Sequence, residues 1–223
     1  MFKYSPPSQA LGLQIVYQDD DLLILDKPSG LLSVPGRGED KQDCLLSRVL
    51  EEFPSALIIH RLDMSTSGLI MMALTESMQV AMGHLFQRRE IEKYYTAVVA
   101  GELAELSGMV NLPLITDWPN RPRQKVDHES GKPSMTEYQV LNYDEVKGQS
   151  RMRLKPLTGR SHQLRVHMLE LGHPIVGDDL YAPEAIRSAS PRLLLHALEL
   201  RFKHPLSGLD LRIECLADPE SFQ

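Results

Sequence analysis

The hydrophobic pattern of this chain consists mainly of short apolar runs that end at glycine, proline or acidic turns, a pattern typical of β-strands. It predicts strands over residues 14–17, 22–26, 57–62, 69–74, 94–100, 136–143, 151–155, 193–202 and 209–215. A polar, glycine-containing loop over 63–68 separates the third and fourth of these strands. Strands therefore make up most of the predicted structure.

Fewer segments favour helices, which we predict over residues 44–53, 75–89 and 161–171. Thr75 is the expected N-cap of the second helix. The third helix would be amphipathic, with Leu164, Met168 and Leu171 on one face. Pro113, Trp118, Pro119 and Pro122 indicate irregular structure. Because strands and helices do not alternate regularly, we expect an α+β fold with mostly antiparallel pairing, not a doubly wound fold.

The length, 223 residues, suits one large catalytic domain. We expect no signal peptide, because the first residues lack an apolar core, and no membrane span, because the longest apolar stretch is only 69–74. The two cysteines, Cys44 and Cys215, have no metal-like spacing and fit a reducing compartment. A cytoplasmic protein is the resulting expectation.

A net charge of −6 argues against nucleic-acid binding, but the charges are unevenly distributed. Residues 151–168 contain five Lys or Arg and no acid. Residues 118–133 hold Arg121, Arg123, Lys125 and Lys132 against Asp127 and Glu129. The acids cluster elsewhere, for example at Asp178-Asp179. Each cluster alone fits a solvated surface, whereas the acid-free stretch favours a basic face for phosphates.

Asp63 is the first candidate for chemistry, in the run His60-Arg61-Leu62-Asp63. It lies where an apolar strand is expected to enter the polar loop, a position that holds a side chain at a surface. On a strand, Arg61 would share a face with Asp63. Alone, this pattern equally fits a surface ion pair beside a turn.

The second candidate segment is Gly159-Arg160-Ser161-His162-Gln163-Leu164-Arg165-Val166-His167. A glycine before a capped helix start presents free backbone N–H groups, which together with Arg160 and His162 suit a phosphate. Arg165, one turn into the helix, has a planar fork that can pair with a carboxylate. A basic amphipathic surface helix is the alternative interpretation.

Two tyrosines open the third segment, Lys93-Tyr94-Tyr95-Thr96-Ala97. Strand alternation should send one ring into the core and the other outward. One ring could stack on a nucleic-acid base, or both could be ordinary core and cross-strand aromatics.

A catalytic metal is not expected. His162, His167, His173 and His196 are the candidate ligands, but His162 and His167 are five residues apart and would not share a helix face. No carboxylate completes a recognisable site. The pair Gly36-x-Gly38 lacks the rest of a phosphate-binding fingerprint.

Taken together, these segments resemble the RluA family of RNA pseudouridine synthases. His60 to Leu69 resembles the family's aspartate motif, Lys93 to Ala97 its tyrosine motif, and Gly159 to His167 its basic motif. Lys27-Pro28-Ser29-Gly30-Leu31 also matches, as does the order of all four. The resemblance implies an α+β fold with a central, mostly antiparallel mixed sheet, flanking helices and loops, and an active-site cleft across the sheet.

The resemblance also implies roles for individual residues. Asp63 would be the essential aspartate, Tyr95 the ring over the target base and Arg165 the partner of the aspartate. Leu164 would pack against the uracil, and Arg61 would enter the RNA stack in place of the uridine. RNA contacts are further expected from His60, Arg121, Arg123, Lys125, Lys132, Arg160, His162 and Gln163. Ser161 departs from the threonine of most relatives but keeps the hydroxyl.

The resemblance covers residues 15–216 as one catalytic domain, with an N-terminal extension over 1–14, a tail over 217–223 and no S4 domain. In this it is most similar to compact family members that modify both 23S rRNA and a tRNA anticodon stem-loop. It implies RNA as the partner, no cofactor, no metal, no membrane and no obligatory protein partner, so a monomer is expected.

Pseudouridine formation breaks the N1–C1′ bond of uridine and joins C5 to C1′, an isomerisation that needs no redox cofactor. Asp63 could attack the base or act on the sugar, and the sequence leaves both open. Two alternatives also stay open: an RNA-binding or assembly factor without chemistry, and a hydrolase acting on free nucleosides. The hydrolase would want a second catalytic carboxylate, which the motifs do not offer.

Overall fold

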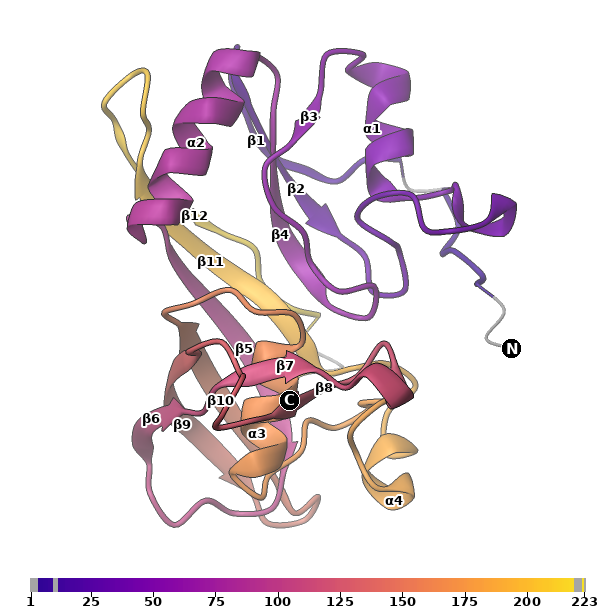
Figure 1. Cartoon of the computed structure of the whole chain (residues 1–223), viewed down its shortest axis with the longest axis vertical. Helices are drawn as coiled ribbons and strands as arrows, with labels where there is room; N and C mark the ends of the chain where they lie inside the picture. Colours follow the sequence, from indigo (N-terminus) through magenta and orange to yellow (C-terminus); the bar gives the residue numbers. More distant parts are fainter. Residues whose placement is uncertain (1–3, 10–11, 219–221, 223) are drawn as a thin grey trace. The chain divides into compact units, whose positions relative to one another are not determined.

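The computed structural model describes residues 4–9, 12–218 and 222 (Figure 1). Its contacts divide the chain into two compact units. Unit 1 consists of Met1–Glu92 with His196–Leu216, and unit 2 of Lys93–Leu195 with Ala217–Gln223. Compact units of this kind can belong to one catalytic domain, so the single domain expected over 15–216 stays a prediction.

The sheet of unit 1 contains strands from both of its chain segments: β1 (Ile15–Gln18), β2 (Leu22–Lys27), β3 (Leu57–Ile58), β4 (Ser67–Ala73), β11 (Leu195–Lys203) and β12 (Asp210–Glu214). The order β1-β2-β4-β11 forms its main path, β3 adds to β4, and β12 adds to β11. Only the β4–β11 pair is parallel among the strand pairs described in this unit. Helical segments of unit 1 are η1 (Glu39–Lys41), α1 (Leu45–Glu52) and α2 (Glu76–Arg88).

Strand β4 carries the core of unit 1, because all of its residues are buried between β2 and β11. Gly68 makes the parallel pairing with β11 possible. Its φ is +105°, and a Cβ at this position would lie 2.3 Å from the Ala197 carbonyl oxygen. Any larger residue would be strained and would push the two strands apart. The glycine that ends the predicted polar loop is thus also, with Ser67, one of the β4 residues that pair with β11.

The main strands of unit 2 pair antiparallel in the order β5-β10-β9-β6, with bounds β5 (Glu92–Ala100), β6 (Ser107–Asn111), β9 (Met135–Asp144) and β10 (Gln149–Pro156). A separate hairpin pairs β7 (Leu114–Thr116) with β8 (Gln124–Val126) around the 3-10 turn η2 (Trp118–Asn120). The helices are α3 (Gln163–Glu170), which contacts β10 and β8, and α4 (Glu184–Arg187). Leu154, Leu164 and Met168 belong to the apolar cluster between helix and sheet.

These observations confirm the α+β class and the mostly antiparallel pairing. The N-cap at Thr75 is also confirmed, since its Oγ1 accepts a hydrogen bond from the Met78 N–H (3.3 Å). In the described part of the chain, no helix has both the length and the apolar character needed to cross a bilayer.

Two predictions about elements were wrong. The apolar run 57–62 is a strand only at Leu57–Ile58, because the residues after it bond to the segment after β2 instead of a neighbouring strand. The third helix begins at Gln163, not 161. Leu164, Met168 and Leu171 pack against one apolar cluster as expected, but all residues from Gln163 to Met168 are buried, so the helix is not amphipathic. The irregular structure expected at Pro113, Trp118, Pro119 and Pro122 is confirmed, although β7 follows Pro113 directly and pairs with β8.

Candidate active site

Asp63 lies in the loop between β3 and β4, in unit 1, and its side chain is half-buried. The turn that follows is closed by the Thr66 N–H, which donates to the Asp63 carbonyl (3.1 Å). Arg61 is exposed in the same loop. Because neither residue is on a strand, the expectation that Arg61 and Asp63 share a strand face was wrong.

The backbone on both sides of Asp63 is fixed by the segment 27–33, which we call the clamp segment. Before Asp63, the Ser33 hydroxyl donates to the Leu62 carbonyl (2.7 Å) and accepts from the Leu62 N–H (3.2 Å). After Asp63, the Met64 carbonyl accepts from the Gly30 N–H (2.9 Å) and from Lys27 Nζ (3.1 Å).

Lys27 completes the clamp segment from inside the core. The side chain has no exposed surface, and its Nζ also donates to the carbonyls of Pro28 (2.9 Å) and Leu31 (2.8 Å). A buried ammonium needs such partners, because burial without them costs several kcal/mol. The Ser29 hydroxyl adds a bond to the Ser65 carbonyl (2.7 Å). The clamp segment therefore holds the carboxylate loop by its main chain at Leu62, Met64 and Ser65.

We expect Ser33→Ala to lower kcat about tenfold while KM changes less, because the mutation frees both polar groups of Leu62, next to Asp63. Ser33→Thr keeps the hydroxyl and should recover part of the rate. Ser150→Ala is the matched control, since that buried hydroxyl donates to the Gly101 carbonyl in unit 2. Both alanine variants should lose about 1 kcal/mol of stability. An equal drop in kcat in both would contradict a positioning role for Ser33.

His60 was predicted to contact RNA, but in the structure its ring contacts other residues of unit 1. Its Nε2 accepts a hydrogen bond from the Met71 N–H on β4 (3.0 Å). Its ring centroid lies 5.2 Å from that of Phe86 on α2. This nitrogen is therefore occupied by the fold, and a contact of His60 with RNA stays a prediction.

The two tyrosines of β5 alternate as expected, in unit 2. Tyr95 is half-buried and packs against the apolar cluster that includes Leu164. Tyr94 faces cations, with the Arg153 guanidinium 4.1 Å and Lys155 Nζ 5.3 Å from its ring centroid. Tyr95 and Leu164 thus border the same cluster, which fits their predicted contacts with one base.

Arg165 is a buried cation on α3 that pairs with two consecutive aspartates. Its Nε donates to Asp178 Oδ2 (2.8 Å), and its Nη2 donates to Asp178 Oδ1 (2.6 Å) and Asp179 Oδ1 (3.0 Å). The side chains of Arg165 and Asp178 are 2% and 1% exposed. This two-point geometry fixes the plane of the guanidinium. The predicted pairing of Arg165 with Asp63 joins residues of different units and stays a prediction.

The turn before α3 differs from the capped helix start that the sequence suggested. His162 has a left-handed backbone (φ 54°), and its side chain caps nothing. Its Nδ1 lies 2.7 Å from the Tyr181 hydroxyl. Gln163, expected to contact RNA, uses its whole amide inside the protein: Oε1 accepts from Thr158 Oγ1 and Arg160 N, and Nε2 donates to Met135 O and Thr136 Oγ1. Arg160 is exposed beside it.

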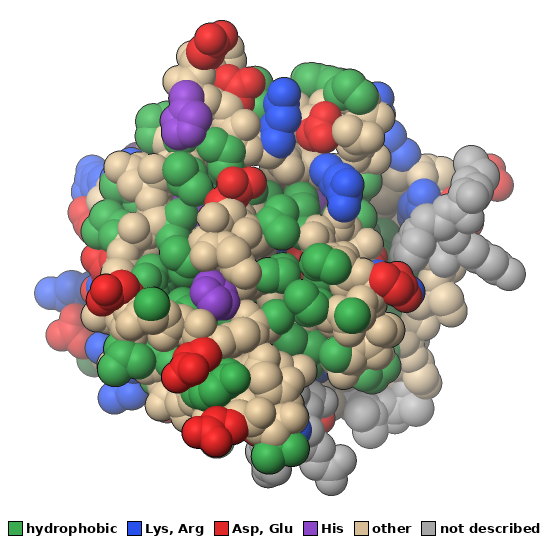
Figure 2. Space-filling view, turned by 90° about the horizontal axis from the view of Figure 1, so that it is seen from below, with side chains coloured by type: hydrophobic (Ala, Val, Ile, Leu, Met, Phe, Trp, Pro, Cys, Tyr) green, Lys and Arg blue, Asp and Glu red, His purple; other side chains and the backbone are tan. Residues whose placement is uncertain are grey.

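The four basic residues expected to bind phosphates between 121 and 132 are exposed in unit 2: Arg121, Arg123, Lys125 and Lys132. Arg123 is anchored, because its Nε donates to the Leu180 carbonyl (2.6 Å). Lys125 lies 3.9 Å from an Asp127 carboxylate oxygen. The face in Figure 2 mixes acidic, basic and apolar side chains, so a continuous basic patch is not a feature of that face.

The histidines considered as metal ligands are engaged with protein atoms. His173 Nδ1 lies 2.8 Å from the Ala100 carbonyl. His167 Nδ1 lies 2.8 Å from Thr136 Oγ1, its Nε2 lies 3.2 Å from the Leu112 carbonyl, and burial lowers the pKa of this imidazole. His167 is therefore part of the core of unit 2.

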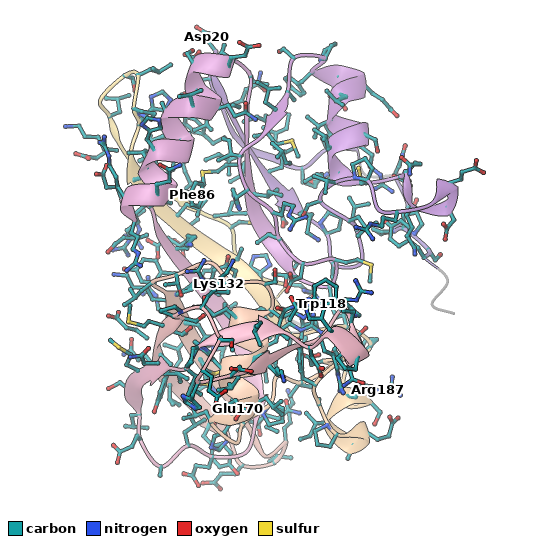
Figure 3. The ribbon with its side chains drawn as sticks, viewed as in Figure 1. Asp20, Phe86, Trp118, Lys132, Glu170 and Arg187 are labelled. Carbon is teal, nitrogen blue, oxygen red and sulfur yellow. The ribbon has the colours of Figure 1, made fainter. Side chains whose placement is uncertain are left out.

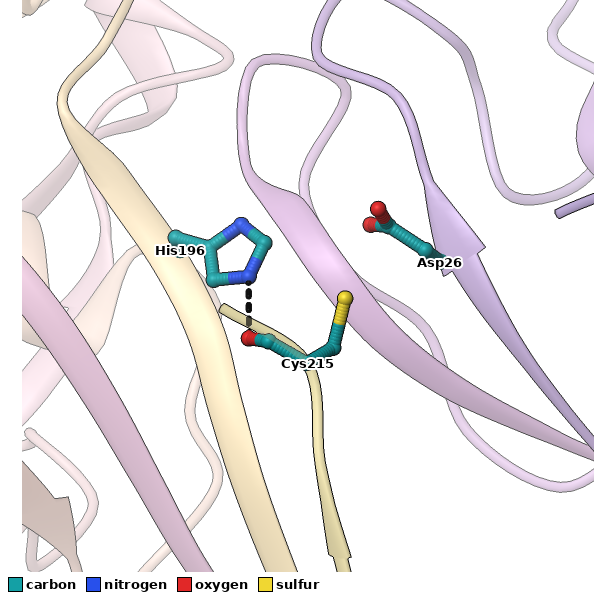
Figure 4. A group of neighbouring side chains, drawn as sticks. All are labelled: Asp26, His196 and Cys215. Atoms are coloured by element: carbon teal, nitrogen blue, oxygen red, sulfur yellow. Dashed lines mark hydrogen bonds between the residues drawn. The ribbon is translucent and has the colours of Figure 1, made fainter. Parts of the chain in front are cut away.

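One group within the described residues brings three possible metal ligands together: Asp26, His196 and Cys215, whose ligand atoms lie within 4.8 Å of one another (Figure 4). His196 uses both ring nitrogens, at 2.9 Å from Ser67 Oγ and 2.9 Å from the Cys215 carbonyl. Burial and then the charge of Asp26 raise the pKa of the Cys215 thiol to about 12. A protonated thiol is a poor ligand, so this arrangement favours a hydrogen-bonded cluster within unit 1.

Sequence reasoning missed Ser33 and Asp178 as residues that support the site. The pair Asp178-Asp179 was grouped with surface acids, whereas Asp178 is buried and binds Arg165. Neighbouring glycine and apolar residues, Ile175-Val176-Gly177, were the available signal of burial. Ser33 carried no signal, because a hydroxyl that bonds a distant backbone leaves no local pattern.

Comparisons with known proteins identify the family of the chain. The family model described as RNA pseudouridylate synthase matches residues 21–170. The chain is 50% identical over 218 residues to the dual-specificity RNA pseudouridine synthase RluA of Escherichia coli K12, covering 98% of this chain and 99% of that protein. To the protein of the same name from Yersinia pestis it is 49% identical over 204 residues, covering 92% and 98%.

Solved structures give the same match at the level of the fold. Human RNA pseudouridylate synthase domain containing 1 superposes with a TM-score of 0.79 at 31% identity, covering 96% of this chain and 87% of that one. Human RNA pseudouridylate synthase domain containing 4 has a TM-score of 0.72 at 23% identity, covering 93% and 89%, and supports the fold alone.

Proposed function

We propose that this chain, which belongs to the RNA pseudouridylate synthase family and is an RNA pseudouridine synthase, modifies uridines in both a 23S rRNA loop and a tRNA anticodon stem-loop. The observation that carries the proposal is the identity of 50% over nearly the whole length of a relative named as dual-specific. Both proposed substrates present unstacked or weakly stacked bases, which cost less to extract than bases in a duplex.

The reaction conserves all atoms of the nucleotide. The N1–C1′ bond breaks, the uracil turns, C5 bonds to C1′, the C5 proton leaves and N1 gains a proton. A carboxylate is suited to this chemistry, since it can bond covalently to an intermediate or remove a proton. We assign this role to Asp63, whose backbone the clamp segment fixes on both sides.

The other site residues are proposed to hold the base, the RNA stack and the charge of Asp63. Tyr95 and Leu164, which border one apolar cluster, hold the flipped uracil. Arg61 is exposed and is proposed to enter the stack that the uridine leaves. Arg165 is proposed to favour the ionised form of Asp63, and Asp178 orients its guanidinium plane. Because Asp178 and Asp179 already bind that guanidinium, Arg165 would interact with Asp63 in addition to these two carboxylates.

Phosphate contacts are proposed for the exposed cations of unit 2: Arg121, Arg123, Lys125, Lys132 and Arg160. Such contacts position an RNA without reading its sequence. They allow a chain with a net charge of −6 to bind a polyanion through a local surface. His162 and Gln163 contribute by shaping the turn that presents Arg160.

We further propose that the protein acts in the cytoplasm, as a monomer without an obligatory protein partner. The two alternatives left open by the sequence are not favoured. A hydrolase of free nucleosides and an RNA-binding factor without chemistry both disagree with membership of a family of RNA pseudouridylate synthases.

Mapping of pseudouridine in 23S rRNA and tRNA from cells with and without this protein tests the dual specificity. We expect sites in both RNAs to revert to uridine when the gene is deleted and to return when it is restored. The purified protein should form the same sites in transcripts of each RNA. Loss in only one RNA class would limit the protein to a single substrate, and loss in neither would contradict the proposal.

A further inference from the structure

Trp118 is the single tryptophan of the chain, and 66% of it is exposed. It belongs to the turn η2 between β7 and β8, where it is labelled in Figure 3. An indole is a large apolar surface whose burial is favourable, so an exposed indole on an ordered turn is available to a partner. None of the roles assigned above uses it.

The turn that carries Trp118 is held by its own bonds, independently of the indole. The Asp117 N–H donates to the Arg123 carbonyl (2.9 Å), and the Arg123 N–H donates to the Asn120 carbonyl (3.1 Å). Asn120 is tied back to Asp117 through its backbone (3.0 Å) and its side chain (2.8 Å). Two prolines, Pro119 and Pro122, further restrict the backbone.

Strand β8 fixes the end of this turn to the rest of unit 2. The Gln124 N–H donates to the Tyr181 hydroxyl (2.7 Å), and Arg123 Nε donates to the Leu180 carbonyl (2.6 Å). Trp118 is thus exposed on a turn that is already ordered, which lowers the entropy lost when a ligand stacks on it.

From β7 to the end of β8 the hairpin that contains Trp118 carries three cations, Arg121, Arg123 and Lys125, against one acid, Asp117. The Arg121 guanidinium lies 4.5 Å from the centroid of the indole, and Arg123 and Lys125 follow along the same hairpin. A guanidinium on one face of an indole leaves the other face for a second planar group. An aromatic ring among exposed cations is the combination that binds single-stranded nucleic acid, the ring taking a base and the cations taking phosphates.

We infer that Trp118 and Arg121 form a stacking platform for an unpaired base of the substrate RNA, a base other than the uridine that is modified. The inference rests on the proposed action on structured RNA. It assigns the platform a part in choosing the substrate, because only an RNA with an unpaired base at the right distance from the target gains the stacking energy.

The sole tryptophan provides its own reporter. The titration uses the Asp63→Asn variant, in which we expect no turnover. Addition of an anticodon stem-loop RNA to this variant should quench the tryptophan emission. Saturation should occur at the RNA concentration at which filter retention shows binding. Heparin, a polyanion without bases, should bind and leave the emission nearly unchanged. RNA binding without a change in emission would overturn the inference.

Kinetics of variants in the otherwise unmodified protein give the second test. Trp118→Ala should raise KM for the stem-loop about tenfold or more with little change in kcat, which is the size of effect that base–aromatic stacking gives. Trp118→Phe should recover most of it. Val146→Ala, at a residue 97% exposed on another turn of unit 2, is the matched control and should leave KM unchanged.

The outcomes separate this inference from the proposed function. An unchanged KM in Trp118→Ala, with normal pseudouridine formation, would contradict the stacking platform but not the proposed function. If RNA quenches the tryptophan emission but the original protein forms no pseudouridine in any RNA, the proposed function is contradicted and the stacking platform is supported. A fall in melting temperature of Trp118→Ala by several degrees, with KM restored at lower temperature, would show a structural role and also overturn the platform.

Discussion

Replacing Asp63 with asparagine should lower the rate of pseudouridine formation by about four orders of magnitude or more, while the affinity for RNA stays within a few-fold of the original. The two side chains have the same shape. The amide, however, has neither the charge that stabilises a cationic sugar nor the basicity to bond or to remove a proton. Since the clamp segment holds the backbone around Asp63, the substitution should not move the loop.

The measurement is a single-turnover assay on a stem-loop transcript, with pseudouridine quantified by mass spectrometry and RNA binding followed in parallel by filter retention. Asp144→Asn is a suitable control, because Asp144 Oδ1 accepts the N–H groups of Val146 and Lys147 in an exposed turn and asparagine keeps an acceptor there. It should be fully active. Full activity in Asp63→Asn would refute the assignment of the carboxylate.

The largest expected effect on stability comes from Asp178→Ala, which should lower the free energy of unfolding by about 3 kcal/mol or more. The mutation removes both carboxylate oxygens that bind the buried Arg165 guanidinium. It also frees the N–H groups of Leu180 and Tyr181, which Asp178 Oδ1 accepts. Asp179 keeps one contact with Arg165, which places the loss near the lower end of the range for broken buried pairs.

The neighbouring residue is the matched control. Asp179 binds the same guanidinium but is 45% exposed, so Asp179→Ala should cost no more than about 1 kcal/mol. Urea unfolding of both variants gives the comparison. A combined Arg165→Met and Asp178→Ala protein should recover part of the stability, since no buried charge is then left without its partner. Equal losses in the two single variants would contradict the buried pair.

Sequence reasoning predicted the features that local patterns encode. The alternation of Tyr94 and Tyr95 and the N-cap at Thr75 follow from spacing within one segment, and the antiparallel α+β class follows from the order of strands and helices along the chain. The strand expected through His60 failed because apolar character alone does not provide a strand partner. Ser33 of the clamp segment bonds the main chain of Leu62 instead.

The candidate site was predicted by resemblance, and its supporting residues were not. Asp178 follows a run of apolar residues and precedes an exposed acid, and its charge suggested a position on the surface. In the structure Asp178 is buried and pairs with Arg165. Gln163 stands within a basic motif and suggested RNA contact, whereas its amide is used four times inside unit 2. Such partners depend on which segments fold together, and one chain without its fold does not reveal them.

The clamp segment also bears on how this loop can be re-engineered. It holds Leu62, Met64 and Ser65 through their carbonyl oxygens and one N–H, groups that every residue except proline provides. Changing the side chains of Met64 or Ser65 to alter what the enzyme accepts should therefore leave the carboxylate where it is. A transplant of the loop into another scaffold, in contrast, must bring residues 27–33 with it.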